Sequence, residues 1–65
     1  METQQGTVKF FNEEKRFGFI SVDETGKDVF VHKSGIKGSI RENDRVEFII
    51  ESGEKGLYAT NVSVL

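Results

Sequence analysis

The sequence predicts an all-β protein of five strands, arranged either as a small antiparallel barrel or as a sandwich. Glycine-containing and polar clusters divide the chain into five runs rich in Val, Ile, Phe, Thr and Tyr, the residue types that strands favour. No window shows the i, i+3, i+4, i+7 apolar spacing of an amphipathic helix. Closure into a barrel would also remove the exposed strand edges that invite aggregation.

The predicted strands cover residues 7–11, 17–22, 28–32, 45–51 and 58–65. The stretch "DETGK" follows the second strand and "SGEKG" follows the fourth, and both are typical of turns. Residues 33–44, "KSGIKGSIREND", contain glycine and serine breaks and are predicted to form a loop, with one short helical turn at most within residues 39–44.

Length and composition limit the class of protein. A chain of 65 residues with no cysteine is expected to form one domain, residues 1–65, with no disulfide and no thiolate metal site. No secretory signal and no apolar run long enough to span a bilayer are present, so we expect a cytoplasmic protein that does not enter a membrane. The net charge is −2, which by itself does not point to nucleic acid.

Alternation along the strands separates two faces, because successive side chains of a strand point in opposite directions. The aliphatic residues are predicted to form the core, which would comprise Ile20, Val22, Val29, Val31, Val46, Ile50, Val62 and Val64. This assignment leaves Phe17, Phe19, Phe30 and His32 on the opposite faces of the second and third strands. The alternative is that the phenylalanine rings fill the interior and the aliphatic residues are mixed.

An exposed cluster of rings next to cations suits single-stranded nucleic acid. Unpaired bases stack on flat rings, and Lys and Arg attract the phosphates. Several cations of the first forty residues lie around the aromatic residues: Lys9, Lys15, Arg16, Lys33 and Lys37. Strands would hold the rings at a fixed spacing before any ligand arrives.

Three motifs in register resemble the bacterial cold-shock proteins. They are "KFFN" at 9–12, "KRFGFI" at 15–20 and "DVFVH" followed by "SGI" at 28–36, and the final "ATNVSVL" is similar to the last strand of that family. The resemblance covers nearly the whole chain. It implies a five-stranded antiparallel Greek-key barrel of the oligonucleotide/oligosaccharide-binding (OB) type. It also implies binding of single-stranded RNA and DNA with little sequence preference, and roles as an RNA chaperone and as a regulator of transcription and translation.

The resemblance also implies a set of binding residues. Stacking platforms would be Phe10, Phe17, Phe19 and Phe30, and His32 would stack or form a hydrogen bond. By the resemblance, phosphate contacts would come from Lys9 and Lys15, while Asp28 would accept a hydrogen bond from a base edge. Arg16 and Lys33 are not part of the family pattern, and we expect them to add phosphate contacts because of their charge. Lys55 in the last hairpin loop would approach the ligand.

Several positions depart from the pattern of that family. Phe10 stands where Trp is usual, Arg16 where Gly is usual, and Lys33 where an aromatic residue follows the histidine. The loop at 34–43 is shorter than usual and lacks its aromatic residue, and Leu57 stands where Pro is common. We therefore expect weaker stacking and a larger electrostatic share of the binding energy.

The same residues also bear on other classes of function. "GIKG" at 35–38 matches the G-x-x-G loop of KH domains, but both KH and RNA-recognition domains need helices that this sequence lacks. A barrel that docks a peptide or partner protein on the ring face is the main alternative.

The single histidine and the adjacent Glu13 and Glu14 form no catalytic or metal-binding motif, so no enzyme, cofactor, metal or small-molecule substrate is expected. We expect a monomer, with a strand-exchanged dimer as the alternative.

Overall fold

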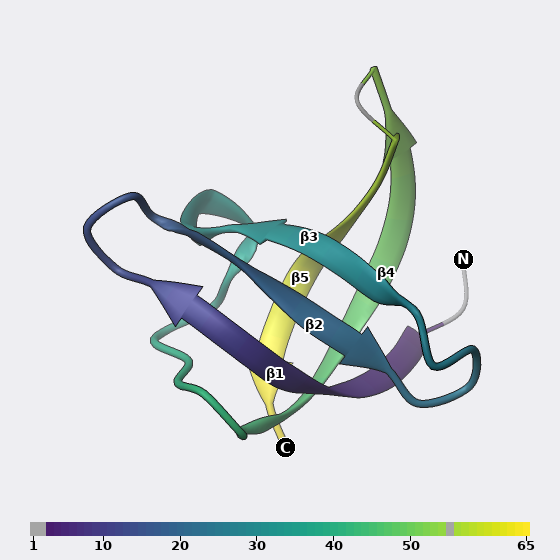
Figure 1. Cartoon of the computed structure of the whole chain (residues 1–65), viewed down its shortest axis with the longest axis horizontal. Coiled ribbons are helices and arrows are strands. Elements are labelled where there is room, and N and C mark those ends of the chain that lie inside the picture. Colours follow the sequence, from purple (N-terminus) through teal and green to yellow (C-terminus); the bar gives the residue numbers. More distant parts are fainter. Residues whose placement is uncertain (1–2, 55) are drawn as a thin grey trace.

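Five strands close into a barrel in the computed structural model, which describes residues 3–54 and 56–65. The strands are β1 (Thr3–Asn12), β2 (Phe17–Val22), β3 (Asp28–His32), β4 (Arg45–Gly53) and β5 (Gly56–Val64). A short 3-10 turn, η1 (Lys33–Gly35), follows β3 (Figure 1). The all-β prediction is confirmed, and the predicted bounds of the second and third strands agree with β2 and β3.

The order of the strands around the barrel is β1-β2-β3-β5-β4, and β4 pairs with β1 to close it. All of these pairs are antiparallel except β3 with β5, which is parallel. β1 can pair with two strands because it is long and turns a corner at Gly6, which lies opposite Val22 on one side and Val46 on the other. A Cβ atom at Gly6 would lie 2.4 Å from the carbonyl oxygen of Ser21, so only glycine fits this corner.

A bulge in β1 changes which way its side chains point. Val8 pairs with Ile20, whereas Phe10 pairs with Phe19, so one additional residue of β1, Lys9, lies between two successive positions of β2. Val8 is fully buried, but Lys9 and Phe10 are both exposed. Simple alternation would have placed Phe10 on the buried face with Val8. The bulge instead turns Phe10 outward.

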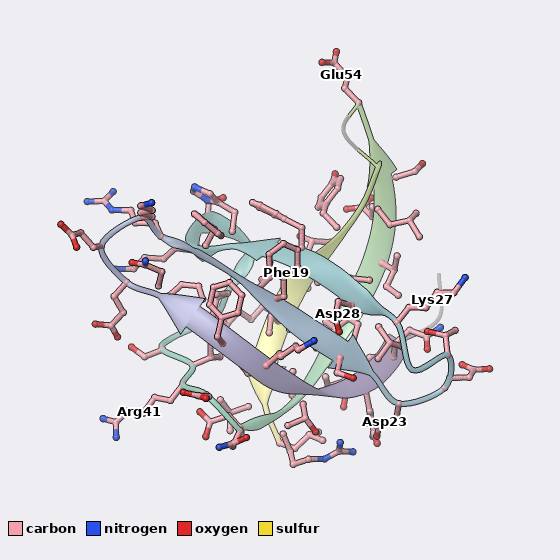
Figure 2. The ribbon with its side chains drawn as sticks, in the orientation of Figure 1. Phe19, Asp23, Lys27, Asp28, Arg41 and Glu54 are labelled. Carbon is pink, nitrogen blue, oxygen red and sulfur yellow. The ribbon has the colours of Figure 1, made fainter. Side chains whose placement is uncertain are left out.

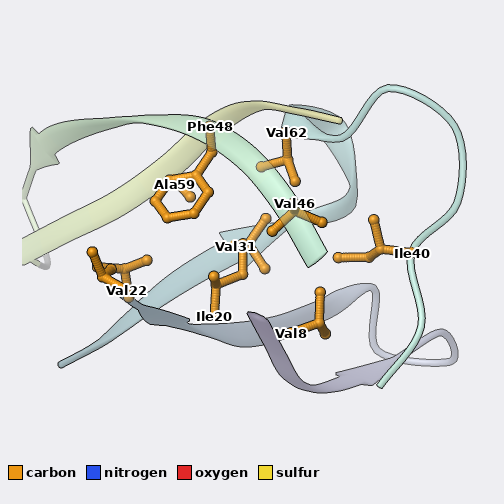
Figure 3. Close-up of a cluster of buried hydrophobic side chains, with 10 residues drawn as sticks. Val8, Ile20, Val22, Val31, Ile40, Val46, Phe48, Ala59 and Val62 are labelled. Carbon is orange, nitrogen blue, oxygen red and sulfur yellow. The ribbon is translucent and has the colours of Figure 1, made fainter. Parts of the chain in front are cut away.

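The interior is filled by aliphatic side chains and one phenylalanine, Phe48, which point toward one another (Figure 3). Six of the predicted core residues are buried: Ile20, Val22, Val29, Val31, Val46 and Val62. Ile50 is half-buried and packs against this cluster. The loop prediction for residues 33–44 missed Ile40, which is 2% exposed and reaches into the core from that loop. Its backbone is irregular, yet its side chain completes the packing.

The prediction that Val64 belongs to the core is wrong. Val64 is 49% exposed although its pairing partner Val46 is fully buried, because Val64 is the last residue of β5 and lies at the rim of the barrel. β5 also contains an additional residue, since Glu47 pairs with Ser63 but Ile49 pairs with Thr60. This irregularity accompanies a positive φ of 53° at Asn61 and makes Ala59, rather than Thr60, the buried neighbour of Val62.

An ion pair joins the turn after β2 to the start of β4. The Arg45 guanidinium donates hydrogen bonds to both carboxylate oxygens of Asp23, at 2.9 and 2.5 Å, and to the Thr7 hydroxyl at 2.8 Å. These hydrogen bonds from Arg45 lower the pKa of Asp23 below its ordinary value of 3.8. Because both side chains are about half exposed, solvent screens the pair and its contribution to stability is modest.

The lowered pKa predicts how Asp23→Asn changes stability with pH. The pair stabilises the fold while Asp23 is ionised, and this contribution is lost as the pH falls below 3.8 towards the folded-state pKa. In urea unfolding, the variant should be less stable than the unchanged protein at neutral pH. The difference between them should shrink in acid. A difference that stays constant or grows in acid would contradict this account of the pair.

Candidate nucleic-acid interface

Four phenylalanine rings form a connected cluster on the outer surface of β1, β2 and β3. The ring centroids of Phe17 and Phe30 are 5.8 Å apart with planes 27° from parallel, which is a stacked arrangement. Phe19 and Phe30 are 6.0 Å apart and meet edge to face. Phe10 lies 5.5 Å from Phe19 and 6.4 Å from Phe17. Figure 2 shows Phe19 near the middle of this outer face.

Strand pairing explains why these rings share one surface. Phe19 pairs with Phe30 on β3 and with Phe10 on β1, and side chains opposite each other in paired strands point to the same face. Phe10 is 40% exposed, and Phe17, Phe19 and Phe30 are half-buried by one another. The predicted separation into an aliphatic core and an outer aromatic face is therefore confirmed. The alternative, in which these rings fill the interior, is wrong.

Gly18 lets β1 approach β2 closely beneath the rings. A Cβ atom at this position would lie 2.3 Å from the carbonyl oxygen of Phe10 and 2.8 Å from the Cα of Phe11. Any side chain here would push the bulged part of β1 away and separate Phe10 from Phe17 and Phe19. The glycine of the "KRFGFI" motif therefore sets the geometry of the neighbouring rings.

The candidate cation Lys9 and the candidate base acceptor Asp28 contact each other directly. The Lys9 ammonium donates a hydrogen bond to an Asp28 carboxylate oxygen at 3.0 Å, across β2. Their side chains are 62% and 39% exposed, so the pair is open to solvent. Sequence reasoning placed both residues at the interface but did not foresee this contact, which joins residues 19 positions apart. Figure 2 shows Asp28 on the same outer side as Phe19.

Arg16 and Lys33 lie at the same end of the ring surface. The Lys33 backbone N–H donates a hydrogen bond to the Arg16 carbonyl at 2.9 Å, which continues the pairing of Phe17 with His32. Arg16 has a φ of 63°, in the left-handed region where a side chain is strained. Lys15, beside it in the exposed turn, donates its backbone N–H to Asn12. Lys55 lies outside the described residues.

His32 is exposed at the end of β3 and also has a structural contact. Its Nδ1 accepts a hydrogen bond from the Ser34 backbone N–H at 3.1 Å, which caps η1. The Ser34 hydroxyl lies 3.0 Å from the same nitrogen. With Nδ1 engaged as an acceptor, the neutral ring carries its proton on Nε2. Nε2 is therefore the nitrogen that can donate to a ligand.

A groove adjoins the rings on the side of the β4–β5 hairpin, which projects from the barrel beyond β3 (Figure 1). Its volume is about 640 Å³. Its lining includes Phe19, Phe30 and His32 from β2 and β3, and Leu57 and Tyr58 from β5. Sequence reasoning assigned no binding role to Tyr58. The signal that could have identified it is an aromatic residue at the start of a strand, but only the β3–β5 pairing brings it beside Phe30.

Two observations bear on other kinds of site. Among residues 3–54 and 56–65, no three His, Cys, Asp or Glu side chains lie close enough together to hold a metal ion. The same residues contain no helix that is long and apolar enough to cross a membrane.

Comparison with known proteins assigns a family to this fold. The family model described as the "cold-shock" DNA-binding domain matches residues 4–65. The chain belongs to the cold-shock domain family. This family is of a nucleic-acid-binding, non-enzymatic kind, so the aromatic and basic face described above lies on a nucleic-acid-binding domain.

Curated relatives of this cold-shock domain are similar over most of their length. The major cold shock protein of Micrococcus luteus is 53% identical over 64 residues, which cover 92% of this chain and 96% of the relative. The cold shock-like protein CspG of Escherichia coli K12 is 48% identical over 64 residues, with 92% and 91% covered. A solved structure of Drosophila Unr CSD456 has a TM-score of 0.82 and 30% identity and covers 98% of this chain, which spans 27% of that longer chain.

The strained backbone at Arg16 predicts that glycine at this position stabilises the cold-shock domain. Arg16→Gly removes the Cβ that is disfavoured at positive φ, so we expect the free energy of unfolding to rise by up to about 1 kcal/mol. The same change removes one of the candidate cations, so its effect on the binding of nucleic acid tests the assignment of Arg16 to the interface. Urea unfolding and a binding titration measure the two effects separately. Arg41→Gly is the matched control, and an Arg16→Gly variant less stable than the unchanged protein would contradict the assigned strain.

Proposed function

We propose that this cold-shock domain binds single-stranded RNA and DNA with little sequence preference. The observation that carries the proposal is the cluster of Phe10, Phe17, Phe19 and Phe30, whose centroids lie 5.5–6.4 Å from their neighbours on a solvent-facing sheet. Every nucleobase has a flat π-face, so such rings accept any base. In a duplex these base faces are covered by stacking, and hence an unpaired strand is the form that can use the cluster.

In addition to stacking, attraction between lysine or arginine side chains and the phosphates contributes to the proposed binding energy. Lys9 lies on the bulge beside Phe10, Lys15 and Arg16 precede Phe17, and Lys33 follows His32. In our proposal these cations contact the phosphates of a strand whose bases lie on the rings, and Lys55 adds a further contact. The acidic residues of the last third of the chain explain why a domain with a net charge of −2 can still present a cationic edge.

The Lys9–Asp28 pair is proposed to open when a strand binds. In the free protein the ammonium and the carboxylate satisfy each other at 3.0 Å. A phosphate would replace the carboxylate as the partner of Lys9, and a base N–H group would replace the ammonium as the partner of Asp28. Because the pair is exposed, its opening costs little. The exchange would then position the strand without a large energetic penalty.

Binding of this kind supports the cellular roles that we propose. A base that is stacked on a phenylalanine ring is unavailable for pairing, so the protein would prevent or melt RNA structure and act as an RNA chaperone. Regulation of transcription and translation would follow from the same activity. We propose that the domain works as a cytoplasmic monomer, without a small-molecule substrate.

The stacking role is tested by truncating single rings. Phe17→Ala or Phe30→Ala should weaken binding of a thymidine octamer by roughly 1–3 kcal/mol, because each removes one stacking surface. Val64→Ala, which trims an exposed apolar residue at the rim, is the matched control and should bind normally. Ile20→Ala, in the core, should lower the free energy of unfolding. Under conditions where this variant is fully folded, its affinity for the octamer should be unchanged. Losses of only a few tenths of a kcal/mol in both ring variants would contradict stacking.

The electrostatic share is tested by the dependence of affinity on salt. With three to five phosphate contacts, a plot of log K against log salt should have a slope of roughly −2 to −3.5 for a single strand. Lys15→Gln should reduce this slope by about 0.7. Arg41→Gln is the control, since Figure 2 shows Arg41 on the loop before β4, away from Phe19. Absence of binding at both low and high salt, together with binding of a peptide, would favour the protein-docking alternative.

A further inference from the structure

We infer that Tyr58 forms an additional base-binding subsite, which extends the ring surface across β3 onto β5. This inference rests on the proposed function, because it assigns one more base of the same bound strand. The candidate site is the groove of about 640 Å³ beside the four-ring cluster. Phe19 and Phe30 belong to both the cluster and the groove, so a strand that leaves the cluster at Phe30 enters the groove directly.

The parallel pairing of β3 with β5 places Tyr58 on the outer face. Phe30 lies opposite Tyr58, and the next pair along is Val31 with Ala59. Val31 and Ala59 are both buried, so the preceding pair points to the outside. Tyr58 is 39% exposed and therefore offers ring surface to a ligand. The neighbouring Leu57 is also exposed and adds apolar surface to the same wall.

The backbone of the hairpin holds the Tyr58 ring in place before any ligand binds. A Cβ atom at Gly53 would lie 3.0 Å from Cε1 and 3.3 Å from Cδ1 of Tyr58. The ring therefore rests against the backbone of Gly53, where a larger residue would displace it. A ring that is already positioned loses little freedom on binding, which favours a stacking role over that of a mobile surface side chain.

The chemistry of the groove fits a base better than a phosphate. Most of its wall is apolar or aromatic, and the described residues of its lining include no lysine or arginine that could pair with an anion. Figure 2 shows the Glu54 side chain at the tip of the hairpin, pointing away from the barrel. His32 also lines the groove, and its Nε2 is free to donate a hydrogen bond to a base carbonyl because Nδ1 accepts from Ser34. A flat ring with one polar donor nearby matches a nucleobase.

The composition of the chain makes a direct test possible. Tyr58 is the single tyrosine, and there is no tryptophan, so tyrosine emission reports on this residue alone. Saturation with a thymidine octamer should quench the emission, and an abasic strand of equal length should leave it nearly unchanged. Tyr58→Ala should weaken octamer binding by roughly 5- to 150-fold, which corresponds to the loss of one stacked base. Tyr58→Phe should bind within about twofold of the unchanged protein if stacking is the dominant contribution.

Phe30→Ala, measured alongside, separates failure of this inference from failure of the proposed function. If Phe30→Ala weakens binding while Tyr58→Ala does not and the emission stays constant, the Tyr58 subsite is overturned and the proposed function stands. If neither variant changes the affinity for the octamer, both the Tyr58 subsite and the proposed function are overturned. The subsite is also overturned if Tyr58→Ala converts a dimer into a monomer, or if a leucine-rich peptide binds as tightly as the octamer in a Tyr58-dependent way.

Discussion

The size of the barrel interior is the constraint on which the binding surface depends. Five strands enclose a core of β-branched residues, one alanine and one phenylalanine, Phe48. Inward positions of β2 and β3 are occupied by Ile20, Val22, Val29 and Val31, each at most 5% exposed. The alternation of strand side chains then directs Phe17, Phe19 and Phe30 outward. The aliphatic core and the aromatic surface are two consequences of the same packing.

The geometry of the surface is established before a ligand binds, and small backbone features are responsible. The bulge at Lys9 turns Phe10 from the interior to the outer face, and Gly18 lets β1 lie close enough for that ring to meet its neighbours. Arg16 has a strained backbone with positive φ, and its carbonyl accepts a hydrogen bond from the Lys33 backbone N–H. This contact keeps the two cationic residues at one end of the ring cluster. A preformed surface spares a bound strand the cost of ordering the protein side of the interface.

The alternation of side chains between the two faces of each strand predicts most of the fold, because one face of each strand lies in the core and the other lies outside. It identified Ile20, Val22, Val29, Val31, Val46 and Val62 as core and the rings of β2 and β3 as external. It fails wherever the phase of a strand changes or a strand ends. Alternation alone cannot direct Phe10 outward without the bulge, and Val64 is exposed because it lies at the rim. Ile40 is buried from a loop that has no periodic pattern.

Parts of the candidate site could not be predicted from the sequence, because they depend on contacts between residues that are far apart in the chain. The contact of Lys9 with Asp28 spans β2, and the neighbourhood of Tyr58 depends on the parallel pairing of β3 with β5. Neither follows from local residue order, because both depend on how the barrel closes. The motifs around Phe17 and Phe30 were visible in the sequence because each lies within a single strand.

In the proposed mode of binding, the outer phenylalanine rings contact nucleobases while the aliphatic core stays closed. This mode is tested most directly by an NMR titration with oligo-thymidine that follows side chains as well as amides. We expect the ring protons of Phe17 and Phe30 and the amides of β2 and β3 to shift, with intermolecular contacts between rings and thymine. The methyl groups of Val46 and Val62 should remain unchanged. Unshifted rings at saturation, or shifts confined to the opposite surface, would contradict the account.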